Sequence, residues 1–320
     1  MPYFNKDQGS LDWGPIDLLF EETSDAQTAS WAANELQKDH QKPFFLACGI
    51  YRPHLPWHVP KEFFDKFPIE DIILPEINMN DLDDVPVKGI EMSDGLTMKG
   101  DYQRISRHQK KKEAVQAYLA STNYADQCVG LVLEALDKSK YRDNTIVVLW
   151  GDHGWHFGEK LSYRKSKLWE ESTRVPFVVL VPGITKPGSR SKRVVNLIDI
   201  YPTLLDLCSL PEKDTNEGRS IVPVLNDPNV DWPYPSITTM GYGNHAIRSE
   251  EWRYIHYKDG MEELYDRRSD PMEWNNLASK QEYIDIKEKL KEWLPNVNKR
   301  IRMKEIGKRG QRKKIVTGLY

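Results

Sequence analysis

An aspartate and a histidine stand side by side in Trp150–Glu159, which reads WGDHGWHFGE. The β-branched run Asn144–Leu149 before them predicts a buried strand. Because ligands of open α/β sheets bind just beyond the carboxyl ends of strands, Asp152 and His153 are expected at a reactive edge. A carboxylate oxygen and an imidazole nitrogen together suit a divalent metal ion. The alternative is structural: a loop aspartate bonded to backbone beside a solvated histidine.

Three further segments carry side chains that could join this pair. Arg52 and His54 follow an apolar segment, and the imidazole of His54 could protonate a leaving oxygen. Lys165, downstream of the Asp-His loop, could hold an anionic group through charge-assisted hydrogen bonds. Asn244 and His245 precede a predicted strand in the second half of the chain. A lone lysine or loop histidine is usually just solvated, so these residues matter only if they converge on one rim.

Composition limits the classes of function. The length of 320 residues suggests about two domains. A formal net charge of -3 gives no basic field for nucleic acid, and no apolar run reaches the roughly 18 residues of a membrane span. Cys48, Cys128 and Cys208 are odd in number and widely spaced, which argues against a disulfide framework and a structural zinc site. Core packing is expected for Cys48 and Cys128.

Local patterns predict alternating helices and strands. Helices are expected over Thr23–Asp39, Lys111–Lys138, Leu168–Ser172, Asp199–Cys208 and Glu282–Leu294. Strands are expected over Pro43–Cys48, Asn144–Leu149, Pro176–Val181, Trp252–Tyr257 and Glu262–Tyr265. The alternation predicts a parallel α/β sheet, followed by a small antiparallel sheet.

The remaining segments are expected to be irregular. Residues 1–25 and Gly49–His58 are predicted as loops, and residues 65–110 as a long substrate-facing excursion. The first residues lack the apolar core of a signal peptide, as if the chain began mid-fold. Residues 299–320 form a basic tail, which is expected to be a solvated terminus or, alternatively, a polyanion-binding segment.

Five segments carry a family resemblance. They are Pro43–Phe64 (PFFLACGIYRPHLPWHVPKEFF), Ile146–Lys160 (IVVLWGDHGWHFGEK), Tyr163–Val179 (YRKSKLWEESTRVPFVV), Leu197–Leu207 (LIDIYPTLLDL) and Ile247–Ala278 (IRSEEWRYIHY…EELYDRRSDPMEWNNLA). In content and order they resemble the type I sulfatases, most closely the iduronate-2-sulfatase-like branch. The resemblance implies an alkaline-phosphatase-like α/β fold, a parallel-sheet sandwich incomplete at its N-terminus. Residues 1–210 would be the downstream part of the catalytic domain and residues 211–298 a smaller C-terminal α+β subdomain.

The resemblance also implies roles for individual residues. Asp152 and His153 fall on metal-binding positions, Lys165 on a sulfate-binding lysine, and His54 on a catalytic-site histidine near the sulfate. The residues expected on the substrate side are Arg52, Asn244 and His245. The implied metal is Ca²⁺, with Mg²⁺ or Mn²⁺ as alternatives, and the implied substrate is a sulfated saccharide.

The sequence departs from the family pattern at the nucleophile. The family's C-x-[PA]-S-R motif, whose Cys is converted to formylglycine, does not occur in this sequence. Cys48 and Arg52 have the right spacing but lack the Pro or Ala and the Ser between them, and Cys48 falls where the family has no nucleophile. The family's upstream aspartate pair on the metal is also missing. We therefore expect a missing upstream half, truncated, encoded separately or lost, and an inactive isolated chain.

Three hypotheses follow for function. The first is a sulfuric ester hydrolase acting on sulfated carbohydrate such as glycosaminoglycan. The second is a phosphoester or phosphonate hydrolase of the same superfamily, which a Ser or Thr nucleophile in place of Cys would indicate. The third is a non-catalytic, carbohydrate-binding remnant. The chain identifies no compartment by itself, and the resemblance implies a periplasmic, secreted or lysosomal protein.

Overall fold

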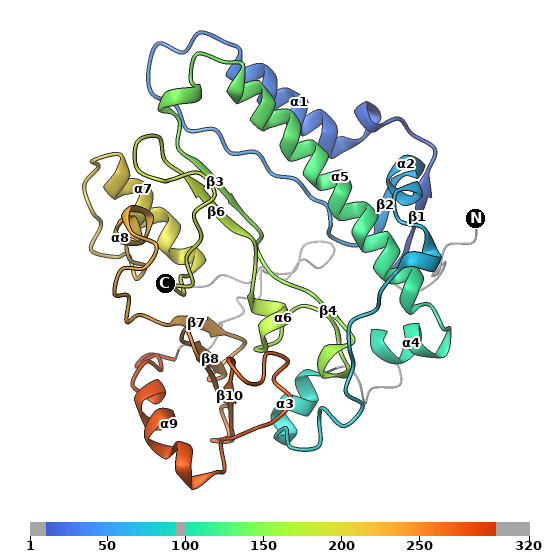
Figure 1. Ribbon diagram of the computed structural model, residues 1–320, viewed down its shortest axis with the longest axis vertical. Coiled ribbons are helices and arrows are strands. Elements are labelled where there is room, and N and C mark those ends of the chain that lie inside the picture. The colour runs from blue at the N-terminus through green and yellow to red at the C-terminus, as the bar shows by residue number, and fades with distance from the viewer. Residues whose placement is uncertain (1–10, 94–99, 299–320) are drawn as a thin grey trace, which may run out of the picture. The chain divides into compact units, whose positions relative to one another are not determined.

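The computed structural model describes residues 11–93 and 100–298. The chain divides into two compact units, each built from several segments (Figure 1). Unit 1 comprises Met1–Glu76, Gly95–Val148 and Val178–Gly183, and unit 2 comprises Ile77–Asp94, Leu149–Phe177 and Ile184–Tyr320. These units interleave along the chain, whereas the predicted boundary at residue 210 divides it once, so that boundary stays a prediction. The basic tail lies outside the described residues.

Two helices, α1 (Ser24–Leu36) and α5 (Lys111–Asp137), form the frame of unit 1 and lie side by side (Figure 1). Both predicted helices are confirmed. In α1 the buried positions recur every three to four residues, which gives the helix one apolar face; they are Ala26, Ala29, Ala32 and Leu36. Among the described residues, no helix is both long and apolar enough to cross a membrane.

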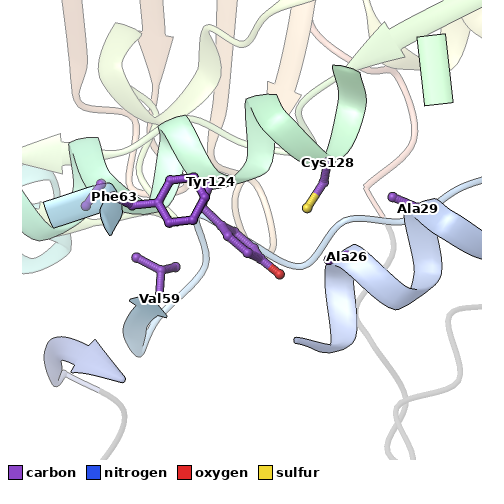
Figure 2. Packing of buried hydrophobic residues seen from close by; sticks show 7 residues of the cluster. Ala26, Ala29, Val59, Phe63, Tyr124 and Cys128 are labelled. Carbon is purple, nitrogen blue, oxygen red and sulfur yellow. The ribbon is translucent and has the colours of Figure 1, made fainter. Parts of the chain in front are cut away.

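The core of unit 1 lies between these helices and strand β2 (Trp57–Pro60) with helix α2 (Lys61–Asp65) (Figure 2). Phe63 and Tyr124 meet edge to face, with ring centroids 5.3 Å apart. The Tyr124 hydroxyl extends past the apolar core to a hydrogen bond of 2.6 Å with Thr23. The other buried members of this core are Ala26, Ala29, Val59, Ala120 and Cys128. The expectation that Cys128 packs in a core is confirmed.

Strand pairing in unit 1 differs from the predicted pattern. β1 (Trp13–Ile16) pairs in parallel with β2, with Trp13 opposite Trp57, so the predicted loops are wrong at both places. Pro43–Cys48 forms no strand, although it was predicted as one. An extended segment becomes a strand only by hydrogen bonding to a neighbour, and no described strand pairs with this one.

Residues 65–110 are not irregular throughout. The short helices there are η2 (Ile69–Asp71), α3 (Val87–Met92) and α4 (Asp101–Arg107). α3 begins directly after Pro86, its N-cap residue. Each is too short to show a helical period in the sequence, which explains why the pattern missed them.

Short strands surround the Asp-His loop. β3 (Val147–Trp150) pairs with β6 (Phe177–Leu180), and both predicted strands are confirmed. β4 (His156–Phe157) and β5 (Tyr163–Arg164) form a small antiparallel hairpin. The helices that follow β3 and β6 include α6 (Glu170–Thr173), α7 (Ile200–Leu207) and α8 (Val222–Asn226).

A four-stranded antiparallel sheet in unit 2 confirms the predicted change of texture. Its strands are β7 (Ser236–Thr239), β8 (His245–Arg248), β9 (Trp252–His256) and β10 (Glu262–Asp266). Their order across the sheet is β10-β9-β8-β7. Helix α9 (Ile284–Lys291) packs on this sheet through Leu290 (Figure 1). Helix α9 therefore covers buried apolar side chains of this sheet.

Candidate active site after strand β3

The Asp-His loop leaves β3 and is held by backbone hydrogen bonds to the segment around α6. Gly151 donates its N–H to the carbonyl of Pro176 at 3.1 Å, and Gly154 donates to that of Ser172 at 2.9 Å. A Cβ atom on Gly154 would collide with the carbonyl oxygen of Glu171 and lie 2.8 Å from that of Arg174. The glycine after the Asp-His pair is therefore required by close packing of two backbones.

Asp152 and His153 differ in exposure. The side chain of Asp152 is 84% exposed, whereas that of His153 is 24% exposed. Oδ1 of Asp152 lies 3.6 Å from Nε2 of His153, a separation compatible with both atoms binding one cation. This carboxylate and imidazole therefore fit as two ligands of a divalent ion. Among the described residues, no cluster of three or more His, Cys, Asp or Glu side chains could hold a metal.

Lys165 reaches the same imidazole. Its Nζ atom lies 2.6 Å from Nε2 of His153, while Nδ1 of His153 lies 2.9 Å from the carbonyl of Gly154. A lysine ammonium only donates, so Nε2 accepts, and the Nδ1–H of the neutral ring donates to Gly154. The structure thus brings together the predicted Asp152, His153 and Lys165 in one unit.

The backbone around Lys165 is unusual. The two residues that flank it, Arg164 and Ser166, both have φ of 68°, in the left-handed region that side chains rarely adopt. The hairpin fixes the first of them, because Arg164 pairs with His156. Such backbone strain persists only where surrounding structure enforces it, and it concentrates at functional sites.

Arg52 and His54 belong to unit 1, and each has local partners there. The backbone N–H of Arg52 donates to Asp25 at 2.9 Å, and its guanidinium donates to the carbonyl of His58. Nδ1 of His54 lies 2.9 Å from the Tyr51 hydroxyl and 2.8 Å from the carbonyl of Leu55. The catalytic role of His54 and the substrate-side role of Arg52 stay predictions.

Asn244 and His245 are buried at the start of strand β8 in unit 2. Asn244 donates to the carbonyl of Met240 and accepts from the N–H of Lys258. His245 bonds Thr239 through Nδ1 and Asn298 through Nε2, at 2.9 and 2.8 Å. These contacts account for both side chains without a substrate, and their assignment to the substrate side stays a prediction.

Sequence reasoning missed a buried charge network behind the loop. Glu170 is surrounded by Arg248, Arg253 and Arg267. Burial alone would raise the pKa of Glu170, but the three guanidinium groups outweigh it and lower that pKa to about 2. The sequence signal that could have indicated this network is Arg253, a charged residue inside the otherwise apolar and aromatic strand β9.

A second buried group lies in β4. The imidazole of His156 is inaccessible to solvent, and its Nδ1 atom lies 3.2 Å from the carbonyl of Glu159. Burial lowers the pKa of His156 to about 3, with a smaller contribution from Lys167. His156 is therefore a neutral, structural residue of the hairpin, in contrast to His153 at its edge.

The chain is similar to known proteins over most of its length. The family model described as Sulfatase matches residues 2–210, and the model described as N-sulphoglucosamine sulphohydrolase, C-terminal, matches residues 151–300. A sulfatase of Formosa agariphila is 39% identical over 289 residues, covering 90% of this chain and 57% of the relative. An iduronate 2-sulfatase of Mus musculus is 32% identical over 217 residues, covering 55% of this chain and 38% of the relative. The chain spans about half the length of the curated relatives it matches.

Solved structures show the fold. A protein in complex with its substrate D-glucosamine-2-N,6-O-disulfate is 25% identical with a TM-score of 0.71, covering 85% of this chain and 68% of that chain. The phosphonate monoester hydrolase of Agrobacterium radiobacter is 21% identical with a TM-score of 0.74, covering 88% of this chain and 61% of that chain. The fold is alkaline-phosphatase-like. With its family model matching residues 2–210, the chain belongs to the sulfatase family.

Proposed function

We propose that this chain forms part of a sulfuric ester hydrolase that acts on sulfated carbohydrate, including glycosaminoglycan. The observation that carries the proposal is the contact of 2.6 Å between Lys165 and His153, beside the exposed carboxylate of Asp152. An ammonium for an anionic group and two metal ligands thus share one loop system. Relatives that include an N-acetylglucosamine-6-O-sulfatase, and the structural neighbour with a bound glucosamine disulfate, support the substrate class.

In this proposal Lys165 binds the sulfate group. Its ammonium would offset charge on the sulfate oxygens in the ground state and on the leaving oxygen as the S–O bond breaks. Asp152 and His153 would hold a cation, for which Ca²⁺ is the first choice and Mg²⁺ or Mn²⁺ are alternatives. A bound cation would polarise the same sulfate oxygens. To hold a cation, Nε2 of His153 would have to give up its hydrogen bond from Lys165.

His54 is proposed as the proton donor to the leaving oxygen of the sugar. An imidazole placed beside a leaving oxygen can donate a proton to it as the bond to sulfur breaks. Arg52, Asn244 and His245 are proposed on the substrate side. For Asn244 and His245 to contact the substrate directly, the hydrogen bonds described above would have to open. Otherwise these two residues would act indirectly, through the loop that their hydrogen bonds close.

In this proposal the nucleophile does not come from these 320 residues. Sulfatases generally use a metal ion and a formylglycine, and the C-x-[PA]-S-R motif that yields formylglycine does not occur among the 320 residues. We propose that an upstream segment of the same enzyme, joined or separate, supplies it together with further metal ligands. This segment is the proposed partner of the chain.

A phosphoester or phosphonate hydrolase is the second candidate. Its support is specific: two phosphonate monoester hydrolases share the fold with TM-scores of 0.74 and 0.75. Those similarities are at 21% and 19% identity and bear on the fold alone, whereas the sulfatase relatives reach 39%. A non-catalytic carbohydrate-binding remnant is the third candidate, and an absent upstream partner would favour it.

The test restores an upstream sulfatase half by fusion or co-expression and compares an aryl sulfate with an aryl phosphate. We expect preferential release of sulfate, and loss of that release in Lys165→Ala. Lys280→Ala is the matched control, because it removes the same side chain from an exposed position of unit 2. Preferential phosphate release would favour the second candidate, and equal rates for Lys165→Ala and Lys280→Ala would contradict the placement of the sulfate site.

A further inference from the structure

The position of the Asp-His loop follows from that of α6. Gly154 donates to the carbonyl of Ser172, and its missing side chain lets the backbone of Glu171 approach directly. Two backbones in such contact move together, because there is no flexible side chain between them to absorb a shift. Whatever fixes α6 therefore also fixes His153, the residue next to Gly154.

Glu273 fixes the start of α6. Its Oε2 accepts the backbone N–H of Glu170, the first residue of α6, at 3.0 Å. Its Oε1 accepts from Nε of Arg253 at 2.6 Å. Arg253 in turn donates to the carbonyl of Leu168 at 2.8 Å and to the carboxylate of Glu170. Glu273 is only 2% exposed, so these charge-assisted bonds act in a water-poor environment.

The same residue also binds the segment that leads to Lys165. The Nζ of Lys160 donates to the backbone carbonyl of Glu273 and, at 2.6 Å, to Oδ1 of Asp81. The N–H of Lys160 donates to Oδ2 of Asp81 at 3.0 Å. Lys160 has φ of 53° and Glu273 has φ of 60°, so both hold left-handed conformations that need external support. This contact anchors the loop between β4 and β5.

We propose that Glu273 is a positioning residue that sets the contact between Lys165 and His153. Its carboxylate holds α6, and through Gly154 the loop of His153; its carbonyl holds Lys160, and through β5 the backbone of Lys165. One residue outside both loops thereby fixes the relative position of their two functional side chains. The inference rests on the proposed function only in treating these side chains as the active site.

The test uses the full chain with isotope-labelled histidine and follows the Nε2 resonance of His153 under native conditions. The reference is Lys165→Ala, in which Nε2 has lost its donor. We expect Glu273→Gln to move the His153 resonance toward its position in Lys165→Ala. The amide has one acceptor oxygen, whereas the carboxylate uses one oxygen for Nε of Arg253 and the other for the backbone N–H of Glu170. An unmoved resonance in folded Glu273→Gln would overturn the proposal.

Glu262→Gln is the matched control for a purely structural loss. Glu262 begins β10 and accepts bonds of 2.6 to 2.8 Å from Tyr254, Lys287 and Lys291, with no bond to either loop. We expect it to lower the unfolding midpoint of the chain while the His153 resonance stays at its wild-type position. A resonance that moves equally in both variants would show that the contact reports general stability, which would also overturn the proposal.

A measurement on the unaltered chain covers the case in which Glu273→Gln does not fold. Hydrogen exchange of the backbone amides of Gly154, Lys160 and Glu170 should give one common opening equilibrium, because the proposed support opens as a unit. Exchange of Gly154 that is at least tenfold faster than that of Glu170 would overturn the proposal. These readouts need no turnover, so an enzyme that hydrolyses phosphate esters would contradict the proposed function and leave the positioning result standing.

Discussion

The ammonium of Lys165 lies 2.6 Å from Nε2 of His153, the ring nitrogen that faces Oδ1 of Asp152. The atom proposed to bind the metal therefore already accepts a hydrogen bond from a cation. In the proposed site, a metal ion and Lys165 would compete for one lone pair, and the two positive charges would repel each other. In the proposed complete site, an anionic sulfate between them would offset that repulsion, so we expect metal occupancy and substrate binding to favour each other.

Removing Lys165 should strengthen metal binding by the isolated chain. We expect weak Ca²⁺ binding, with a Kd above about 10⁻⁴ M, because two ligands are few for an ion that takes about six to eight. Lys165→Ala should tighten binding roughly tenfold by removing charge repulsion and freeing Nε2. Calorimetry measures both affinities, with His153→Ala as the control that abolishes binding. A sub-micromolar site in the unaltered chain, or weaker binding by Lys165→Ala, would contradict this.

The isolated chain should not turn over sulfate esters. Covalent catalysis needs the attacking group, and the C-x-[PA]-S-R motif does not occur in this sequence. The measurement is release of an aryl alcohol from an activated aryl sulfate by the purified chain. Turnover that disappears in Lys165→Ala would show that another group of this chain serves as nucleophile.

In the restored enzyme, Lys165→Ala should lower the rate by about 10² to 10³, the usual effect of losing one preorganised donor. His54→Ala should slow hydrolysis of a sugar sulfate more than that of an activated aryl sulfate, because a good leaving group needs no proton. Steady-state kinetics on both substrates separate the two roles. Equal losses on both substrates for His54→Ala would remove its assignment as the acid.

Gly154→Ala should destabilise the chain, because its Cβ would collide with the carbonyl oxygen of Glu171. Overpacking of this kind costs about 1–3 kcal/mol or more. Gly130→Ala in α5 is the control: a Cβ there meets nothing within 4 Å, and alanine in a helix interior is favoured by about 0.5–1 kcal/mol. Urea unfolding of the two variants should shift in opposite directions. A neutral Gly154→Ala would mean that the loop is not packed on α6.

Acid should weaken unit 2 through Glu170. Its pKa is about 2 in the fold against 4.5 ordinarily, so its stabilisation is complete above pH 4.5 and is lost as the pH falls toward about 2. The loss amounts to about 3 kcal/mol at most. His156, whose pKa is lowered from 6.5 to about 3, adds a second loss of stability as the pH falls from about 6.5 toward 3. Over this range the unfolded state takes up a proton that the folded state does not. Glu170→Gln should be less stable near neutral pH but have a flatter profile below pH 4.5. An unchanged profile in urea unfolding would contradict the assignment.

Much of the local structure could be predicted from the sequence. The periodic alanines of α1 and the long apolar face of α5 specify helices within one segment, because residues three or four apart share a face. The β-branched run Asn144–Leu149 likewise predicted the strand that is observed as β3, just before Asp152. These features depend on neighbours in the chain, so the residue pattern is sufficient.

The tertiary structure decided what these elements contact. Three sets of contacts depend on segments that lie apart in the chain. They are the contact of Lys165 with His153, the hydrogen bonds of His245 with Thr239 and Asn298, and the hydrogen bonds of Glu273 with α6 and Lys160. The sequence by itself determined the chemical groups near the end of β3 and the helices that frame unit 1. The structure alone determined their partners, because hydrogen bonds and ion pairs form only at contact distance, which sequence spacing does not specify for residues on different elements.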